Sequence, residues 1–338
     1  MDKLIRADGQ PHFGIFPAAP GLINYRDFDF RSPMGRRLGA LAKWRRFHQF
    51  QYFGLISDEL IGGCALANLS LVGIGFVYLY HPASGRMLER QFKLPLGLGT
   101  RFSQSPDDGV CELRQGRNRL RLENSALAGE KRLRVELDDG TRIDACFSER
   151  QPAFQPMYIC TPAAVNGWVY AQKVAGVACR GEVKSALGNF DLGRIGAFAH
   201  HDWSAGYMRP ETNWNWACLS GLAAGQRVGL NLSCGVNETS FTENCFWLDG
   251  QLFKVDTVRF SFDRDRPLDT WTIRSHDNQV ELSFVGAGLH QERLNLGFIA
   301  SNFRQVFGRF SGTLRPPGRP PLSIDDIWGF VEDQYVKW

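Results

Sequence analysis

Apolar and polar residues alternate along most of this chain, in short runs that turn residues separate. In the first half the runs cover residues 49–52, 61–69, 72–80, 87–93, 119–123, 132–138 and 141–147. A period of two places successive side chains on opposite faces of an extended chain, so each run predicts a β-strand. The Asp139-Gly140 pair is a strong signal for a tight hairpin turn between the last two runs.

The second half continues the same pattern. Residues 168–174 and 177–183 predict a strand pair, and further strands are expected over 214–219, 227–234, 245–247, 251–262, 271–275, 279–284, 295–299, 307–314 and 324–338. Turns recur roughly every 8–12 residues without alternating helices, which favours antiparallel sandwiches or barrels. We therefore predict an all-β chain of two antiparallel β-barrel or sandwich domains packed side by side, over residues 1–200 and 201–338.

One segment near the start departs from the period of two. Residues 34–46 combine apolar residues with Arg36, Arg37, Lys43, Arg45 and Arg46, and their spacing predicts one short basic amphipathic helix. Such a helix can make a peripheral contact with a membrane of anionic lipid. A solvated basic face is the simpler interpretation, and both stay open.

Composition narrows the function classes. The net charge of +4 is small, so it gives no argument for nucleic-acid binding. No phosphate-binding loop, dinucleotide fingerprint or serine-nucleophile motif is present, and we expect no organic cofactor. The eight cysteines include no pair at metal-binding spacing, and we expect no metal site.

The same cysteines indicate the cellular compartment. They are Cys64, Cys111, Cys146, Cys160, Cys179, Cys218, Cys234 and Cys245, mostly among apolar neighbours, and we expect reduced, buried thiols. No signal peptide is evident, and polar residues and glycines interrupt the longest apolar run, near residues 66–80. Together these features predict a cytoplasmic protein.

Candidate chemistry concentrates between residues 200 and 216. Asp202 lies among histidines and tryptophans, and burial of a carboxyl group in such surroundings raises its pKa. A neutral carboxylic acid can protonate a double bond, so the candidate catalytic residues are Asp202, His200 and Tyr207. The alternative is structural: Asp202 pairs with Arg209 or caps a turn. In an extended stretch His200 shares a face with Asp202, whereas His201 points the other way.

Aromatic, amide and charged residues nearby are candidates for substrate binding. They are Arg209, Trp203, Trp214, Trp216, Asn231, Asn244, Lys173 and Glu332. Purely structural interpretations stay open as well. The two asparagines can form hydrogen bonds with the backbone at a bulge, and Lys173 can be a surface residue whose aliphatic stem is buried. Glu332 is a second carboxyl group, which only the fold could bring near Asp202.

Several motifs together resemble an uncharacterised family of bacterial and fungal proteins of unknown function. They are Trp168 to Lys173, Asp202-Trp203, Trp214-Asn215-Trp216, Glu243-Asn244, Gln305 to Gly308 and the terminal Gly329 to Asp333 with Lys337-Trp338. That family is in turn distantly similar to two-domain lipocalin-like proteins, among them carotenoid 1,2-hydratases, tocopherol cyclases and fungal Diels–Alderases. Those relatives usually carry Glu where this chain has Asp202, one methylene shorter.

The resemblance implies two lipocalin-like domains and an apolar ligand. We expect a hydrophobic small molecule, isoprenoid-like or polyketide-like, to bind in a pocket between the domains. The reaction implied is an acid-assisted hydration, isomerisation or cyclisation without a cofactor. A non-catalytic carrier of a lipophilic ligand and a structural module are the alternatives, because one scaffold hosts many functions.

Overall fold

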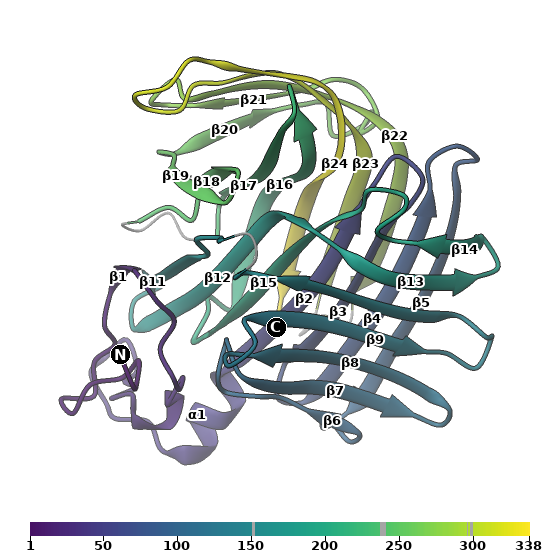
Figure 1. Cartoon of the computed structure of the whole chain (residues 1–338). Helices are drawn as coiled ribbons and strands as arrows, with labels where there is room; N and C mark the ends of the chain where they lie inside the picture. Colours follow the sequence, from purple (N-terminus) through teal and green to yellow (C-terminus); the bar gives the residue numbers. More distant parts are fainter. Residues whose placement is uncertain (151–152, 237–240, 296, 298–299) are drawn as a thin grey trace.

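Three antiparallel sheets make up almost all of the molecule, for which we use a computed structural model (Figure 1). The structure describes residues 1–338 except 151–152, 237–240, 296 and 298–299. Within the described residues the helices are α1 (Ala40–Arg46) and the single 3₁₀ turn η1 (Tyr25–Asp27). The prediction of an all-β chain is confirmed.

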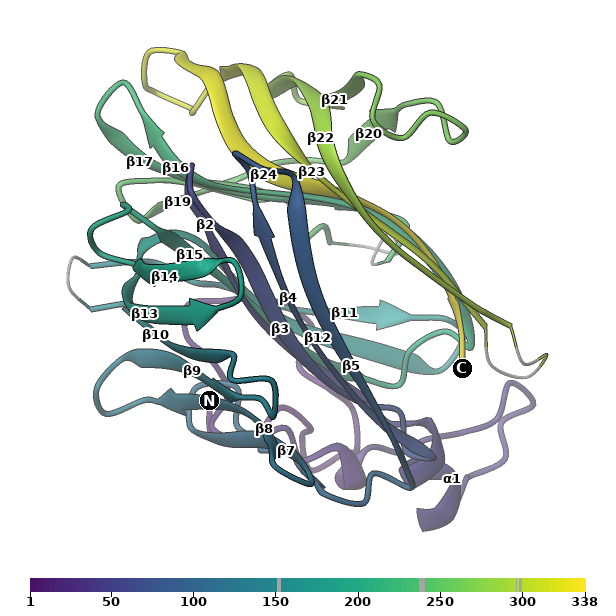
Figure 2. The ribbon, with the colours of Figure 1, turned by 90° about the vertical axis from the view of Figure 1, so that its right-hand side faces the viewer.

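An eight-stranded sheet forms the middle layer, with the order β1-β11-β12-β15-β2-β3-β4-β5. Its two faces are covered by different parts of the chain, as the side view in Figure 2 shows. Its strands are β1 (Gly14–Phe16), β2 (His48–Ile56), β3 (Ile61–Asn68), β4 (Val72–His81), β5 (Arg86–Pro95), β11 (Met157–Ala163), β12 (Gly167–Ala178) and β15 (Phe198–Gly206).

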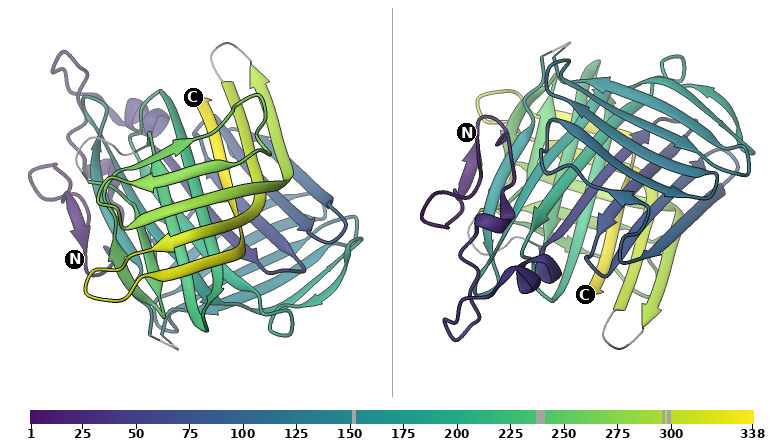
Figure 3. Two further views of the ribbon diagram at one scale, coloured as in Figure 1. Left: turned by 90° about the horizontal axis from the view of Figure 1, so that it is seen from above. Right: turned by 90° about the horizontal axis from the view of Figure 1, so that it is seen from below.

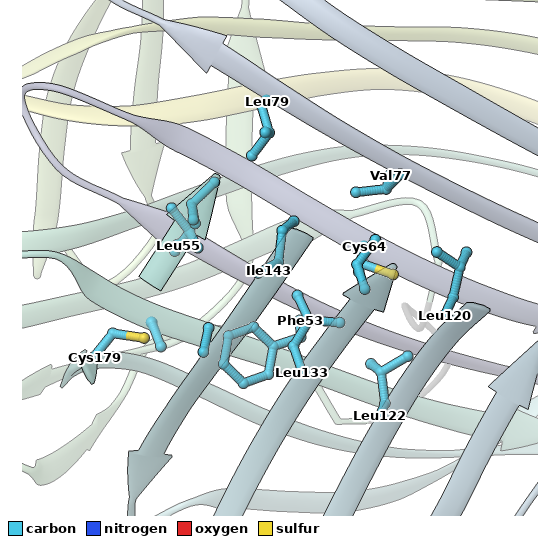
Figure 4. Close-up of a cluster of buried hydrophobic side chains, with 14 of the residues drawn as sticks. Phe53, Leu55, Cys64, Val77, Leu79, Leu120, Leu122, Leu133, Ile143 and Cys179 are labelled. Carbon is cyan, nitrogen blue, oxygen red and sulfur yellow. The ribbon is translucent and has the colours of Figure 1, made fainter. Parts of the chain in front are cut away.

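A seven-stranded sheet covers one face of this middle layer. Alternate side chains of both sheets point into a continuous apolar core, which includes Phe53, Leu122 and Ile143 (Figure 4). The N-terminal arm covers the rest of the same face. The strands of the second sheet are β6 (Thr100–Arg101), β7 (Gly109–Gln115), β8 (Asn118–Ser125), β9 (Glu130–Glu136), β10 (Arg142–Ser148), β13 (Arg180–Ser185) and β14 (Gly188–Asp191).

A nine-stranded sheet covers the opposite face of the middle layer. The sheet is strongly curved, as the view from above in Figure 3 shows, and it encloses a core of its own. A further apolar cluster joins it to the eight-stranded sheet. Its strands are β16 (Glu211–Ala223), β17 (Gln226–Cys234), β18 (Cys245–Leu248), β19 (Gln251–Lys254), β20 (Val258–Ser261), β21 (Trp271–Ser275), β22 (Val280–Asn295), β23 (Ala300–Leu314) and β24 (Leu322–Lys337).

The chain passes from the middle sheet to the nine-stranded sheet between Gly206 and Glu211. The strand that carries Asp202 therefore belongs wholly to the middle sheet, paired with β12 and β2. A division into folding domains at residue 200 stays a prediction.

Three sequence-based expectations need correction. The strand expected over 251–262 is two strands, β19 and β20, which lie at opposite edges of the nine-stranded sheet. The helix expected over 34–46 begins only at Ala40, because Gly35 adopts a positive φ of 81° and residues 31 and 37 form a β-bridge. The hairpin expected from 168–174 and 177–183 is one long strand, β12, that continues past a bulge at Gly176. The chain then enters the seven-stranded sheet as β13. The strand expected over 295–299 lies partly outside the described residues.

Candidate active site between two sheets

A cavity of about 280 Å³ lies between the middle sheet and the nine-stranded sheet. Strands β2, β4, β12 and β15 supply one wall, and β16, β22, β23 and β24 supply the other. Apolar side chains line its length: Phe50, Ala67, Leu69, Ile74, Phe76, Val169, Met208, Leu294, Phe303 and Val336. A cavity of this composition suits an apolar ligand with few polar groups.

One end of the cavity is charged and deeply buried. The Lys173 ammonium lies 2.7 Å from Asp202 Oδ2 and 3.3 Å from Glu243 Oε1. All three residues are less than 8% exposed. Ser204 donates a hydrogen bond to the other oxygen of Asp202, and Ser233 donates one to Glu243. This cluster of one cation and two carboxylates joins the middle sheet to the segment just before β18.

The charges of this cluster depend on one another. Burial lowers the pKa of Lys173, but Asp202 and Glu243 outweigh burial and raise that pKa above its ordinary value, so the amine stays charged. Burial raises the pKa of Asp202, and the ammonium 2.7 Å away opposes that rise. The Trp216 ring lies 5.3 Å from the ammonium and provides a cation–π contact.

Glu332, on the wall that the nine-stranded sheet supplies, is another buried carboxyl group of the cavity. Burial raises its pKa to about 8, even though Trp214 and Gln305 oppose the rise by donating hydrogen bonds to its two oxygens. At neutral pH this carboxyl group is therefore largely protonated. The indole of Trp214 can only donate, whereas the carboxamide of Gln305 has both a donor and an acceptor atom.

A hydrogen-bonded chain of aromatic residues lies beneath the charged end. The hydroxyl groups of Tyr52 and Tyr78 are 2.7 Å apart, and His200 Nε2 is 3.2 Å from the Tyr52 hydroxyl. Burial lowers the pKa of His200 to about 3, so its ring is neutral at physiological pH. The ring fits only because position 54 is glycine: a Cβ there would lie 2.0 Å from Nε2.

Polar groups also occur along the rest of the cavity. His290 Nε2 lies 2.9 Å from Glu89 Oε1, and the ring of His290 contacts Tyr78 and Phe303. Towards the other end, Lys93 pairs with Glu292 at 2.6 Å; these two side chains are 43% and 30% exposed. We call this more exposed end the mouth of the cavity. His48 and Trp338, whose rings pack together, also line the cavity.

The structure brings together about half of the residues that the sequence selected. Asp202, Lys173, Trp214, Trp216 and Glu332 line the charged end, and Arg209 lies towards the mouth. The sequence left open an ion pair between Asp202 and Arg209. In the structure Asp202 pairs with Lys173 instead, and Lys173 is buried rather than at the surface.

Five of the selected residues lie away from the cavity lining, and three of them are His200, Trp203 and Tyr207. His200 shares a face with Asp202, as predicted, but Tyr52 lies between its ring and the cavity. Trp203 and Tyr207 project from the opposite face, because they are an odd number of residues from Asp202. Trp203 packs on Tyr170, and the Tyr207 hydroxyl donates to the Tyr25 carbonyl oxygen at 3.0 Å.

The two asparagines support the site from behind. Asn231 accepts a hydrogen bond from the Trp216 indole at 2.8 Å and donates to the Glu243 backbone carbonyl at 3.0 Å. Asn244 accepts from the Ser233 backbone amide and donates to the Asp256 carbonyl. Neither lines the cavity; both hold residues that do.

Sequence reasoning missed two residues of the cavity wall. Glu243 was noted only as part of a motif with Asn244, although a glutamate in that position could have been weighed as a third carboxylate. His290 stands in a strand whose neighbours gave no chemical signal. Within the described part of the chain, no three His, Cys, Asp or Glu side chains are grouped as metal ligands would be.

Comparison with known families shows what this chain belongs to. Residues 6–338 match the family described as a domain of unknown function, DUF2804, so the chain is a member of that family. The resemblance to an uncharacterised family is thereby confirmed. A comparison with curated protein sequences finds no match.

Solved structures provide the likeness in fold. Kievitone hydratase from Nectria haematococca superposes with a TM-score of 0.56 at 9% identity, over 85% of this chain and 88% of the hydratase. The structure of CghA with Sch210972 gives a TM-score of 0.61 at 9% identity, over 100% of this chain and 97% of CghA. A putative AttH from Nitrosomonas europaea gives 0.51 at 15% identity, over 86% of this chain and 92% of the other. At these identities the likeness is one of fold.

Proposed function

We propose that this protein binds an olefinic lipophilic molecule, of isoprenoid or polyketide type, between its two large sheets and catalyses an acid-assisted hydration, isomerisation or cyclisation. The observation that carries the proposal is Glu332: a buried carboxyl group with a pKa of about 8, on the wall of an apolar cavity. An acid that stays protonated at neutral pH in a dry site is suited to protonate a carbon–carbon double bond.

Glu332 suits the role of proton donor better than Asp202, which the sequence favoured. The ammonium of Lys173 is 2.7 Å from Asp202 and stabilises its ionised form. Glu332 is contacted instead by neutral donors, the indole of Trp214 and the amide of Gln305. Asp202 is therefore assigned the complementary role, that of a carboxylate that accepts a proton.

The proposed reaction transfers one proton at each end. Glu332 donates its proton to one olefinic carbon, which leaves a cation on the ligand and a carboxylate on the protein. The π faces of Trp214 and Trp216 and the carboxylate of Asp202 stabilise the cation. Addition of water with loss of a proton to Asp202 completes a hydration. Loss of a neighbouring proton to Asp202 completes an isomerisation, and attack by a second, nucleophilic group of the ligand, with loss of its proton to Asp202, completes a cyclisation.

The comparisons support the proposal at the level of the scaffold. One structural neighbour is named a hydratase, and another, CghA, was solved with the compound Sch210972, so this fold accommodates a hydratase and the binding of a small organic molecule. A cytoplasmic location is part of the proposal, because seven of the eight cysteines are buried among apolar groups. The described residues contain no helix that is long and apolar enough to cross a bilayer.

The experiment begins with the ligands that the purified protein retains from olefin extracts, identified by mass spectrometry. Retained isoprenoid and polyketide olefins are then incubated with the protein in ¹⁸O-labelled water and, separately, in deuterium oxide. Hydration adds labelled oxygen, whereas isomerisation and cyclisation incorporate deuterium at carbon. Glu332→Gln should lower the rate of label uptake by roughly 10²–10⁴-fold while the ligand is still retained, because only the acid is removed.

Glu292→Gln is the matched control, since it removes a carboxylate from the mouth of the same cavity. Its rate should stay near that of the wild type. If Glu332→Gln keeps its rate within tenfold, Glu332 is not the donor and the assignment falls. If the protein retains olefins but never incorporates label, the protein is a carrier and the catalytic proposal is wrong.

A further inference from the structure

Apolar side chains are exposed around the mouth of the cavity. Leu41 and Trp44 on α1 are 76% and 40% exposed, and Leu71, in the turn between β3 and β4, is 43% exposed. Leu96, in the turn after β5, is 61% exposed. These four residues are called the rim.

Direct contacts tie the parts of the rim to one another and to the cavity. Ser70 donates a hydrogen bond to the Trp44 carbonyl at 2.7 Å, and the Leu96 amide donates to the Leu71 carbonyl at 2.8 Å. Leu69, next to Ser70 in the same turn, lines the cavity. Figure 2 shows α1 beside the ends of β3, β4 and β5.

The helix of the rim is not held by the core of the molecule. None of its seven residues is buried. Leu41 and Trp44 are three residues apart, so they lie on the same side of the helix and project together. Burial of a tryptophan and a leucine inside the protein would stabilise the fold. Their exposure side by side on this helix therefore indicates that they bind an external surface.

The segment that contains the helix of the rim is basic. Residues 34–46 contain Arg36, Arg37, Lys43, Arg45 and Arg46 and no acidic residue. Arg37 pairs with Asp29 at 3.1 Å, and Lys43 donates to a backbone carbonyl. Arg36, Arg45 and Arg46 are exposed to solvent.

We propose that the rim docks on the surface of a membrane that contains anionic lipid, with the cavity mouth facing the bilayer. Three features select this occupant. The apolar residues project from a helix and two turns rather than lining a groove, a shape suited to insertion between lipids. A tryptophan is among them, and this side chain favours the interface between acyl chains and headgroups. The basic residues match anionic headgroups.

This inference goes beyond the proposed function. Only the purpose of docking rests on the proposed function: docking lets an apolar ligand move between the bilayer and the cavity without crossing water. Docking can be measured without any substrate, so failure of docking and failure of catalysis are distinguishable.

The test is flotation of the purified protein with vesicles of phosphatidylcholine alone and of phosphatidylcholine mixed with phosphatidylglycerol. The wild type should bind the anionic vesicles, and added salt should weaken binding. Arg45→Gln with Arg46→Gln should weaken it roughly 25-fold, at about fivefold for each charge removed. Leu41→Ser with Trp44→Ser should weaken it at least roughly tenfold, because the apolar anchor is lost.

Matched controls lie on the nine-stranded sheet. Arg259 and Arg274 are exposed cross-strand partners, and Leu222 is 55% exposed near the far end of β16. Arg259→Gln with Arg274→Gln, and Leu222→Ser, should bind vesicles like the wild type. Circular dichroism checks that every variant is folded. The proposal is overturned if the wild type does not float with anionic vesicles, if folded rim variants float as well as the wild type, or if the controls lose binding equally.

Discussion

At the scale of single residues, the ion cluster at the end of the cavity is held by one cation. Lys173 pairs with both Asp202 and Glu243, so its loss would remove the cation that balances Asp202 and weaken the charge balance at Glu243. Breaking a buried pair typically costs about 3–5 kcal/mol, because an uncompensated charge remains. The stability of this part of the molecule therefore depends more on Lys173 than on either carboxylate.

We expect Lys173→Met to lower the free energy of unfolding by about 3–5 kcal/mol, measured by urea denaturation. Asp202→Asn should cost less, since Lys173 keeps Glu243. The double variant, Lys173→Met with Asp202→Asn, should recover part of the loss, because position 202 then carries no buried charge for Lys173 to balance. A Lys173→Met protein within 1 kcal/mol of the wild type would show that the cluster is hydrated rather than buried, since a hydrated pair is worth only about 0–1 kcal/mol.

The pKa of Glu332 predicts a dependence of stability on pH. Its value is about 8 in the folded protein and about 4.5 in the unfolded chain. Between these values the folded state binds more protons, so this group stabilises the fold fully below pH 4.5 and the contribution is lost as the pH rises through 8. Glu332→Gln removes this titration, while the opposite contribution of His200 remains in both proteins.

We therefore expect the stability of the wild type relative to Glu332→Gln to fall by up to about 4 kcal/mol between pH 5 and pH 8. Denaturation by urea across this range, on both proteins in parallel, measures the difference. A difference that is constant with pH would mean that Glu332 is ionised throughout, and the assignment of a neutral acid would be wrong.

The alternation of side chains along a strand explains which residues of the site could be placed from the sequence and which could not. The period of two correctly placed His200 on the face of Asp202, and the same rule excludes Trp203 and Tyr207, which were nevertheless selected for their chemistry. Glu332 could be named but not placed, because its proximity depends on the pairing of β24 with β16. Glu243 joins Lys173 only across two sheets, and alternation within a strand carries no information about that contact.

At the scale of elements, most strands were predictable because their alternation is local. Some strands were not predicted, among them β7, β11 and β15, and a further error occurs where one strand changes neighbours. β12 pairs with β15 through a bulge at Gly176, after which the chain crosses to another sheet as β13. The apolar pattern on either side of the bulge looks like two strands of a hairpin, so only the tertiary packing distinguishes the two arrangements.

At Gly176 the middle sheet also approaches the nine-stranded sheet closely. The φ of Gly176 is 81°, and a Cβ there would lie 2.6 Å from the backbone nitrogen of Gly229 in β17. Gly176→Ala should therefore destabilise the fold by about 2–4 kcal/mol, from backbone strain and from displacement of β17. Gly225 has a φ of 80° with open space around it, so Gly225→Ala isolates the strain alone. Equal losses of stability in the two variants would contradict a close approach of the sheets at Gly176.

At the scale of the whole molecule, the other parts of the fold pack against the middle sheet. The seven-stranded sheet and the N-terminal arm cover one of its faces, and the nine-stranded sheet covers the other. The cavity exists only because the second contact is incomplete: the sheets meet around Trp216 and Phe330 and separate towards the mouth. The sequence predicted two β-units side by side, but the point at which one unit ends depends on which sheet receives β15.

That point predicts the behaviour of fragments. A chain ending at residue 200 keeps only the first three residues of β15, the strand that joins β12 to β2, and should not fold. A chain ending at residue 209 completes the middle sheet but leaves the face of Tyr52, Tyr78 and Met157 without its cover. We expect this longer fragment to show a strand-rich circular dichroism spectrum together with strong binding of anilinonaphthalene sulfonate, which reports exposed apolar surface. If the fragment ending at residue 200 folds equally well, then β15 is not needed to close the sheet, and the division at residue 200 holds. If the longer fragment is folded and binds no dye, the two sheets are independent, and the cavity between them would be a contact of finished domains rather than part of one fold.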